Sequence, residues 1–393
     1  MRKTTLAAAL SLAALAAPGT GHAGAMDDLH AAVQGGKATL DLRLRAEYAD
    51  YETTPETDAE TLRTVLGYRS GDFHGATAYL EFENVSSLGN GDYYSGNTGA
   101  GNNKAQFGTI ADPALTQLNQ GYLETYGLRA GRQKIVYDNA RFIGDVAWRQ
   151  NDQVYDAVSF ANTTWVKDLA LNAAWLTRVH NIYGATRAVE APLLNLRYAA
   201  HPQARVGAFY YAVEETAAPT TSWQHAGARV DGGLGHFLYE LSRVEQSDYA
   251  DATAAASPDA TYTDLQLGWK FGALTVKAQQ ETLEKGFKTP LATLHAFNGW
   301  ADRFLTTPAN GLEDTNLKLL GTVAGFKLAV AAHDFKAEAT DEDYGQEVDV
   351  SIGRDLRPGM NVLLKYAEFN ADGSVTGYAN DTRKAWLQLT CKI

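Results

Sequence analysis

The sequence predicts an all-β fold, a single antiparallel β-barrel of about 18 strands that crosses a membrane. Three observations lead to this prediction: an export signal at the start, a series of amphipathic segments of strand length, and connectors that alternate between short and long. Composition alone does not separate this class from a soluble protein, because 45% of the residues are hydrophobic and the mean hydropathy is -0.28.

The first 25 residues have the features of a secretory signal peptide. Arg2 and Lys3 precede an apolar run at 6–17, and small residues follow it. This run is shorter than the roughly 20 residues that a membrane-spanning helix needs. We therefore expect residues 1–25 to be removed. Cys391 is the only cysteine of the chain, so a disulfide within the chain is impossible.

Both ends of the mature chain alternate apolar and polar residues with period two, which is typical of a strand with one apolar face. The stretch "ATLDLRLRAEY" puts leucines on one face and Arg43 and Arg45 on the other, and "KAWLQLTCKI" closes the chain in the same way. Similar segments lie at 61–70, 75–85, 117–126, 128–137, 153–162, 168–179, 192–200, 204–214, 222–231, 235–246, 261–271, 273–283, 315–322, 325–336, 345–354 and 360–369.

Most of these segments are close to the 9–11 residues that a tilted strand needs to cross a bilayer. In 128–137 and 153–162 the pattern leaves open which parity faces outward. We predict one barrel domain over 37–393, preceded by a short periplasmic lead-in at 26–36.

The connectors alternate between short and long along the chain. Short ones include "YG", "HPQ", "FG" and "LRPG", whereas long ones include "SDYADATAAASPDA" and the whole of 284–314. Outer-membrane barrels have short periplasmic turns and longer extracellular loops. An even number of strands then places both termini in the periplasm.

Polar faces of the strands must look into the barrel, because a charged group at the bilayer midplane costs about 2–4 kcal/mol on the lipid face. Arg43 and Arg45 are therefore predicted to point inward. The same side of the pattern carries further arginines, namely Arg63, Arg178, Arg197 and Arg229. The net charge of -12 is a sum over the whole chain, and much of the acid lies in predicted outer loops. The lumen can be basic although the protein is acidic.

Residues 138–151 form the third predicted outer loop, which we expect to fold inward and narrow the pore. Its apolar residues would pack against the wall, while Arg141 and Arg149 would face the aqueous constriction. An alternative is that these arginines hold the loop down by pairing with nearby carboxylates, namely Asp138, Asp145, Asp152 or Asp156.

The second long loop, 284–314, is too apolar in its middle for a freely solvated connector. Its apolar residues recur at nearly helical spacing around Trp300, which predicts a short helical turn at or in the barrel mouth. Asp302 and Arg303 are expected on the wet side of this turn.

Two stretches of the chain resemble a known family. "LRAGRQKIVYDNARFIGDVAWRQNDQVYDAVSF" (128–160) and "TPLATLHAFNGWADRFLTTPANGLEDTNLKL" (289–319) are similar to the alginate export family of outer-membrane porins. The resemblance implies an 18-stranded barrel whose arginine-lined lumen passes an anionic polysaccharide. It maps the arginines of the family's motifs onto Arg132, Arg141 and Arg149.

The pattern and the resemblance together predict a bacterial outer-membrane channel for anionic solutes or oligosaccharides. We expect Glu124 and Asp156 to line the pore with the arginines. The alternative is a non-conducting barrel, plugged by its loops, with a structural or adhesive role. The expected partners are membrane lipid, lipopolysaccharide and the solute, without nucleic acid or cofactor. The histidines have no metal-ligand spacing and no G-x-S-x-G motif is present, so an enzyme is not expected.

Overall fold

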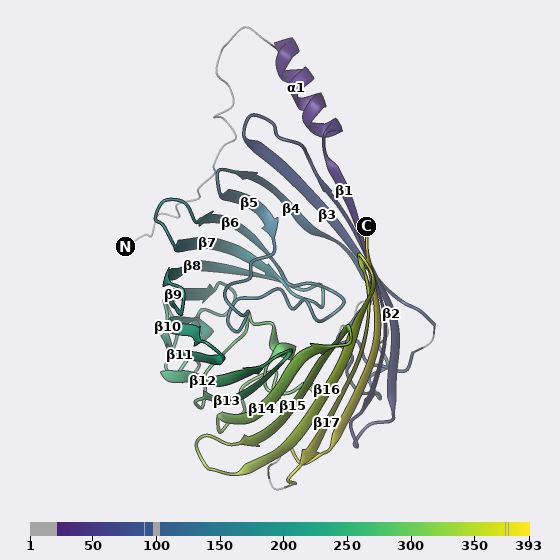
Figure 1. Cartoon of the computed structure of the whole chain (residues 1–393), viewed down its shortest axis with the longest axis vertical. Coiled ribbons are helices and arrows are strands. Elements are labelled where there is room, and N and C mark those ends of the chain that lie inside the picture. The colour runs from purple at the N-terminus through teal and green to yellow at the C-terminus, as the bar shows by residue number, and fades with distance from the viewer. Residues whose placement is uncertain (1–21, 90, 97–102, 374, 376) are drawn as a thin grey trace.

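The described residues form a closed antiparallel barrel of 18 strands, preceded by one short α-helix (Figure 1). The computed structural model describes residues 22–89, 91–96, 103–373, 375 and 377–393. Its strands are β1 (Lys37–Asp50), β2 (Thr57–Arg69), β3 (Ala76–Ser87), β4 (Leu115–Thr125), β5 (Leu128–Gln133), β6 (Val154–Asn162), β7 (Leu169–His180), β8 (Thr186–His201), β9 (Ala204–Glu215), β10 (Trp223–Leu234), β11 (Phe237–Asp248), β12 (Ala260–Phe271), β13 (Leu274–Leu283), β14 (Leu312–Val323), β15 (Phe326–Lys336), β16 (Asp343–Arg357), β17 (Met360–Ala371) and β18 (Thr382–Lys392).

Each strand pairs with its neighbours in sequence, and β1 pairs with β18 to close the sheet. The predicted fold and the number of strands are confirmed. Every predicted segment overlaps one strand, although several boundaries differ, by four residues or more at β2, β5 and β8. β8 begins at Thr186 instead of 192, which shortens the loop before it, and β5 ends at Gln133 instead of 137.

β5 is short because the chain leaves the wall there. Gly131 has φ +131°, and a Cβ at this position would lie 2.2 Å from the carbonyl oxygen of Gly121 on β4. Only glycine tolerates both the dihedral and the close approach. After Gln133 the chain turns into the lumen and rejoins the wall at Val154.

The two faces of the wall differ as the alternation predicts. On β1 the side chain of Leu44 is exposed on the outside, whereas Arg43, Arg45 and Glu47 are buried inside. The arginines of β1 therefore point into the barrel, as expected. The parity that the sequence left open on β6 is also settled, because Val158 is exposed outside and Tyr155 is fully buried inside.

The helix α1 (His22–Gln34) precedes β1 and contacts the turn between β2 and β3. The backbone N–H of Gly71 donates to the carbonyl of Ala32 over 2.8 Å, and the Tyr68 hydroxyl donates to the carbonyl of Val33. Most of the predicted signal peptide lies outside the described residues. No helix in the described part of the chain is long and apolar enough to cross a membrane.

Two connectors lie inside the barrel, 134–153 between β5 and β6 and 284–311 between β13 and β14. Backbone hydrogen bonds join them, from Gly144 N–H to the carbonyl of Leu291 over 2.8 Å and from Thr293 N–H to the carbonyl of Ala140 over 2.9 Å. The predicted helical turn is present in the second loop, but it is only a 3-10 turn at Leu294–Ala296.

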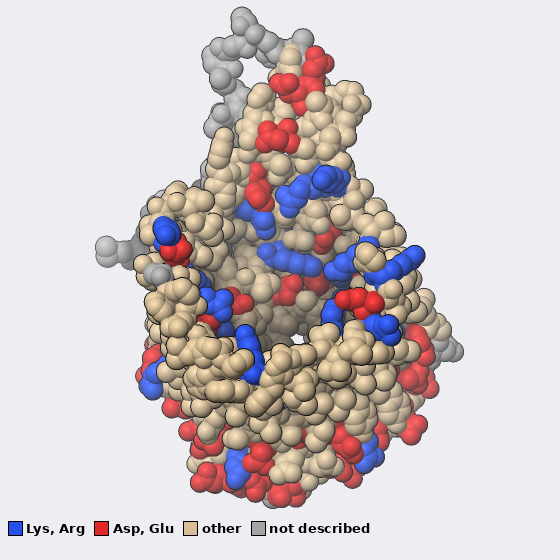
Figure 2. Space-filling model, viewed as in Figure 1, with Lys and Arg blue, Asp and Glu red and all other residues tan. Residues whose placement is uncertain are grey.

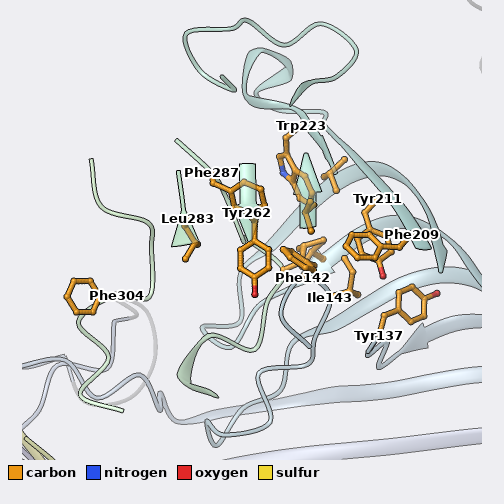
Figure 3. Packing of buried hydrophobic residues seen from close by; sticks show 14 of the residues in the cluster. Tyr137, Phe142, Ile143, Phe209, Tyr211, Trp223, Tyr262, Leu283, Phe287 and Phe304 are labelled. Carbon is orange, nitrogen blue, oxygen red and sulfur yellow. The ribbon is translucent and has the colours of Figure 1, made fainter. Parts of the chain in front are cut away.

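Apolar side chains of the two loops pack against inward side chains of the wall. Figure 3 shows Phe142 and Ile143 surrounded by aromatic residues of β9, β10 and β12 and of the second loop. The ring centroid of Phe142 lies 5.1 Å from that of Tyr262 and 5.3 Å from that of Phe209. Phe304 of the second loop packs separately, 4.4 Å from Phe335. The expectation that the third outer loop folds inward and packs on the wall is confirmed.

Candidate functional site

The candidate site is the lumen where the two inward loops meet the wall. Arg141, in the first loop, is 2% exposed and forms a salt bridge with Glu281 of β13, with 2.7 Å between Nε and Oε1. Its Nη2 donates to Asn298 Oδ1 of the second loop over 2.9 Å. One guanidinium therefore joins both loops to the wall.

Arg149 makes a second link of the same kind with another part of the wall. Its Nη1 lies 3.1 Å from Glu47 Oε2 of β1, and its Nη2 lies 2.7 Å from Asp302 Oδ2 of the second loop. Asp302 also receives the ammonium of Lys384 from β18 at 3.0 Å. These charged groups are buried, so each carboxylate depends on its cations for compensation.

Arg43 and Arg45 hold the first loop by its backbone. Arg43 Nη1 donates to the carbonyl of Ala147 over 2.9 Å, and its Nη2 donates to that of Arg149 over 2.9 Å. Arg45 Nη2 donates to the carbonyl of Trp148 over 2.5 Å. Both arginines are therefore bound to the loop and are not exposed to the passage through the barrel.

The buried positions of Arg141 and Arg149 correct the expectation that they face an aqueous constriction. They act as struts, which is the alternative drawn from the sequence. Their partners also differ from the four aspartates proposed there, because the carboxylates that meet them come from β1, β13 and the second loop, with Asp112 of the connector between β3 and β4 at 3.9 Å from Arg149. Sequence separation hides such partners, since Arg141 and Glu281 are 140 residues apart. Asp302, which was expected on the wet side, is likewise buried among these charges.

Lys365 of β17 lies where the two loops and the wall meet. Its ammonium is 3.6 Å from the ring centroid of Trp300 and 4.2 Å from that of Trp148. It is also 2.6 Å from His295 Nε2. An ammonium only donates hydrogen bonds, so Nε2 accepts, and Nδ1 carries the proton that it donates to Asp302 over 2.6 Å.

The environment keeps His295 neutral and Asp302 ionised. Burial lowers the pKa of His295 well below its usual range and outweighs the attraction of Asp302, and the charges of Lys365 and Arg149 lower it further. Burial alone would raise the pKa of Asp302, but the surrounding cationic groups and the hydrogen bond from His295 hold it well below its usual range.

Arg132 and Asp156 lie on the outer face of the wall, which corrects their assignment to the pore. Asp156 stands between Tyr155 and Ala157, whose side chains belong to the inner core, so alternation turns it outward. Arg132 Nε is 2.9 Å from Asp156 Oδ1. Arg178 of β7, also predicted inward, joins the outer pair at 3.6 Å. The strand pairing of β7 with β6 and β8 is irregular between Leu176 and Arg178 or next to it, and a shift of one residue in register turns a side chain to the other face of the sheet. This irregularity explains why Arg178 was predicted on the wrong face.

Glu124 lies in the lumen near the periplasmic ends of the strands, if the short turns are periplasmic as predicted. It accepts from Arg129 Nη2 over 2.7 Å, and Arg69 Nη1 is 3.8 Å away. All three side chains are about one-third exposed or more. The position agrees with the expectation for Glu124, and a contact with solute stays a prediction.

A cavity of about 340 Å³ opens below the first loop, between its residues 136–139 and strands β7 to β10. Arg197, Arg205 and Arg229 line it. Arg197 and Arg229 were placed on the inner face from the sequence, whereas Arg205 was overlooked. The alternation of "ARVGAFYYAVEE" would have found it, because Arg205 shares parity with the buried Phe209 and Tyr211.

Lysine and arginine side chains, with some acidic ones among them, lie round the hollow in the centre of the face shown in Figure 2, while acidic side chains dominate the lower edge of the molecule. The described residues contain no group of three or more His, Cys, Asp or Glu arranged to hold a metal ion.

No protein-family model and no curated protein sequence matches this chain. Solved structures do match. Pseudomonas aeruginosa OccK3 (OpdO) is 14% identical with a TM-score of 0.70, covering 94% of this chain and 98% of that chain. OccK9 (OpdG) of the same bacterium is 12% identical with a TM-score of 0.69, covering 92% and 99%. OpdK of the same bacterium, solved with vanillate, is 14% identical with a TM-score of 0.66, covering 91% and 98%.

At these identities the likeness shows the fold alone. The chain has the 18-stranded barrel of these structures, one of which is described as an outer membrane protein. The resemblance to the alginate export family also implied such a barrel. The matching structures do not point to that family in particular.

Proposed function

We propose that the protein is a bacterial outer-membrane channel through which anionic solutes, including short anionic oligosaccharides, pass selectively. The observation that carries the proposal is the gathering of inward Lys and Arg side chains round the hollow of an 18-stranded barrel (Figure 2). OpdK has the same fold and was solved with vanillate, a carboxylate, which adds support.

Charge selectivity follows from where the charges lie. Interactions between exposed charges are largely screened beyond about 8–10 Å at physiological salt, so acidic outer loops contribute little inside the lumen. Half-exposed cations on the lumen wall, such as Arg69 and Arg129, act on a solute at close range. The inner loops narrow the passage, and solutes move along what remains of the lumen.

Ion current through a planar bilayer tests this function directly. With a gradient of KCl across the bilayer, the reversal potential of the intact mature protein should show a preference for chloride over potassium. A preference for potassium would contradict anion selectivity, although it would leave a channel function standing.

A second function, a non-conducting barrel with a structural or adhesive role, is favoured by one observation. The two loops interlock inside the lumen through buried ion pairs and a shared aromatic core, which is the arrangement of a plug. Absence of current from correctly folded, bilayer-inserted protein would support this function and contradict the first.

A further inference from the structure

The helix α1 carries an apolar stripe that the barrel leaves exposed. Met26, Leu29 and Val33 are three and four residues apart, a spacing that places them on one face of a helix. Their side chains are 65%, 43% and 53% exposed. Removal of residues 1–25, as predicted, would leave all three in the mature chain. The stripe is therefore an apolar surface that the fold itself does not use.

A different face of α1 holds the helix to the barrel. The side chain of Ala32 is buried, and its carbonyl accepts from the backbone N–H of Gly71, in the turn between β2 and β3, over 2.8 Å. Asp28 Oδ2 lies 3.2 Å from His74 Nε2 of the same turn. These contacts fix α1 beside the turn, and the helix projects beyond the end of β1 (Figure 1).

The end of α1 lies against the lipid-facing side of the wall. The hydroxyl of Tyr68 on β2 donates to the carbonyl of Val33, and it leaves no room for a Cβ at Gly36. Tyr68 pairs with Leu80 of β3 and shares its face of β2 with Leu66. Leu66 and Leu80 are exposed on the outer wall, and tyrosine is typical of the membrane–water interface. The stripe therefore begins beside the lipid-facing surface of the barrel.

The polar side chains of α1 lie on other faces of the helix. They include Asp27, His30 and Gln34, and the Nε2 atoms of the last two are 3.1 Å apart. The helix contains no lysine or arginine. Attraction to anionic headgroups is therefore absent, and burial of apolar side chains is the force that would hold α1 on a membrane.

We propose that α1 is an interfacial helix whose stripe lies among the acyl chains, next to the headgroups, in the leaflet at the short-turn end of the barrel. This is the periplasmic leaflet if the short turns are periplasmic, as predicted. The partner is the lipid surface, because the stripe adjoins the lipid-facing wall and offers neither positive charge nor a shaped pocket. In this position α1 fixes the depth of the barrel at β1, where the sheet closes on β18. The inference goes beyond the channel function and rests only on a barrel that spans a membrane.

Site-specific fluorescence in phosphatidylcholine vesicles tests the position of the stripe. The mature protein carries the environment-sensitive dye NBD on a single cysteine, Leu29→Cys or Ala31→Cys, in a Cys391→Ser background. Ala31 is exposed on nearly the opposite side of the helix from Leu29, because residues two apart point about 200° apart. The dye at 29 should emit at shorter wavelength, be quenched by a lipid spin-labelled near its headgroup and be protected from iodide. The dye at 31 should behave in the opposite way in all three measurements.

A charge placed on the stripe is the matched perturbation. Leu29→Asp, monitored by the dye at Val33→Cys, should abolish the emission shift and the quenching by spin-labelled lipid, since a carboxylate opposes burial among acyl chains. Ala31→Asp is the control, because it adds the same charge on the far side of the helix, and it should leave both signals unchanged. Unheated gel mobility verifies that each variant is folded.

Equal access of iodide to positions 29 and 31 would overturn the proposal, since the stripe would then face water. Protection from iodide without quenching by spin-labelled lipid would also overturn it, because protein would then cover the stripe, either a second copy of the chain or one of its own loops. Ion current enters neither measurement. Failure of the channel function would therefore leave this inference standing, and failure of this inference would leave the channel function standing.

Discussion

Replacing Arg149 by Gln tests whether the inward loops are held by buried charges. The substitution keeps much of the length and some hydrogen bonding of the side chain, but removes the charge that faces Glu47 at 3.1 Å and Asp302 at 2.7 Å. Removing one partner of a buried pair costs about 3–5 kcal/mol, because the other charge stays buried without compensation. Lys384 still compensates Asp302, so Glu47 takes most of the penalty.

The loops should loosen before the wall does, since the backbone hydrogen bonds of the sheet are untouched. We expect Arg149→Gln to conduct with larger and noisier single-channel steps than wild type and with weaker ion selectivity. A residue that merely faced an open constriction would give a different result. Its loss would shift the reversal potential toward cations with little change in conductance.

A second substitution isolates the cause. Glu47→Gln in the Arg149→Gln background removes the uncompensated carboxylate, so it should recover part of the lost stability and narrow the conductance again. Arg243→Gln is the control, because Arg243 forms an exposed pair with Glu245 and exposed pairs contribute only about 0.2–1 kcal/mol. Thermal loss of the compact gel form measures stability, and planar bilayer recording measures conductance. Wild-type conductance and stability in Arg149→Gln would refute the strut argument.

Three further predictions follow from other parts of the molecule. Tags at Asp251 should be accessible on intact cells and tags at Pro358 should not, as labelling with a membrane-impermeant reagent would show; the reverse pattern would invert the topology. Phe142→Ala should lower stability by about 3–5 kcal/mol, because its ring packs among aromatic side chains, and an unchanged thermal transition would contradict the packing role. His295 is buried in its neutral form and its pKa is lowered in the folded protein. As the pH falls below about 6.5, this histidine therefore takes up a proton in the unfolded protein before it does so in the folded protein. Stability should therefore decline from about pH 6.5 downward, and His295→Gln should flatten that decline. The Asp302 pKa is also lowered, so its ion pairs should persist until the pH falls well below about 3.8.

The wall of the barrel could be predicted from the sequence because its pattern is local. Each strand repeats with period two, and the connectors between strands alternate between short and long. Lipid outside and charge inside impose the same rule on every strand, as with exposed Leu44 and buried Arg45 of β1. The rule failed where the register slips. Arg178 follows the irregularity on β7 and lies outside, against expectation.

The contents of the lumen depended on contacts that no local pattern records. The sequence indicated that the loop carrying Arg141 folds inward, because it is the third predicted outer loop and a loop in that position can narrow the pore. Its partner Glu281 could not be identified, because many carboxylates alternate onto the inner face and only closure of the barrel decides which one comes within 2.7 Å.

The sequence by itself determined the class of the protein, the order of its strands and which side of most strands faces inward. Only the tertiary structure decided that Arg141 and Arg149 are buried struts, that Arg132 and Asp156 lie outside, and that Arg205 belongs to a cavity. The physical reason is the range of the forces involved. Alternation acts between neighbours in the chain, whereas compensation of a buried charge acts across the barrel, between residues that folding alone brings together.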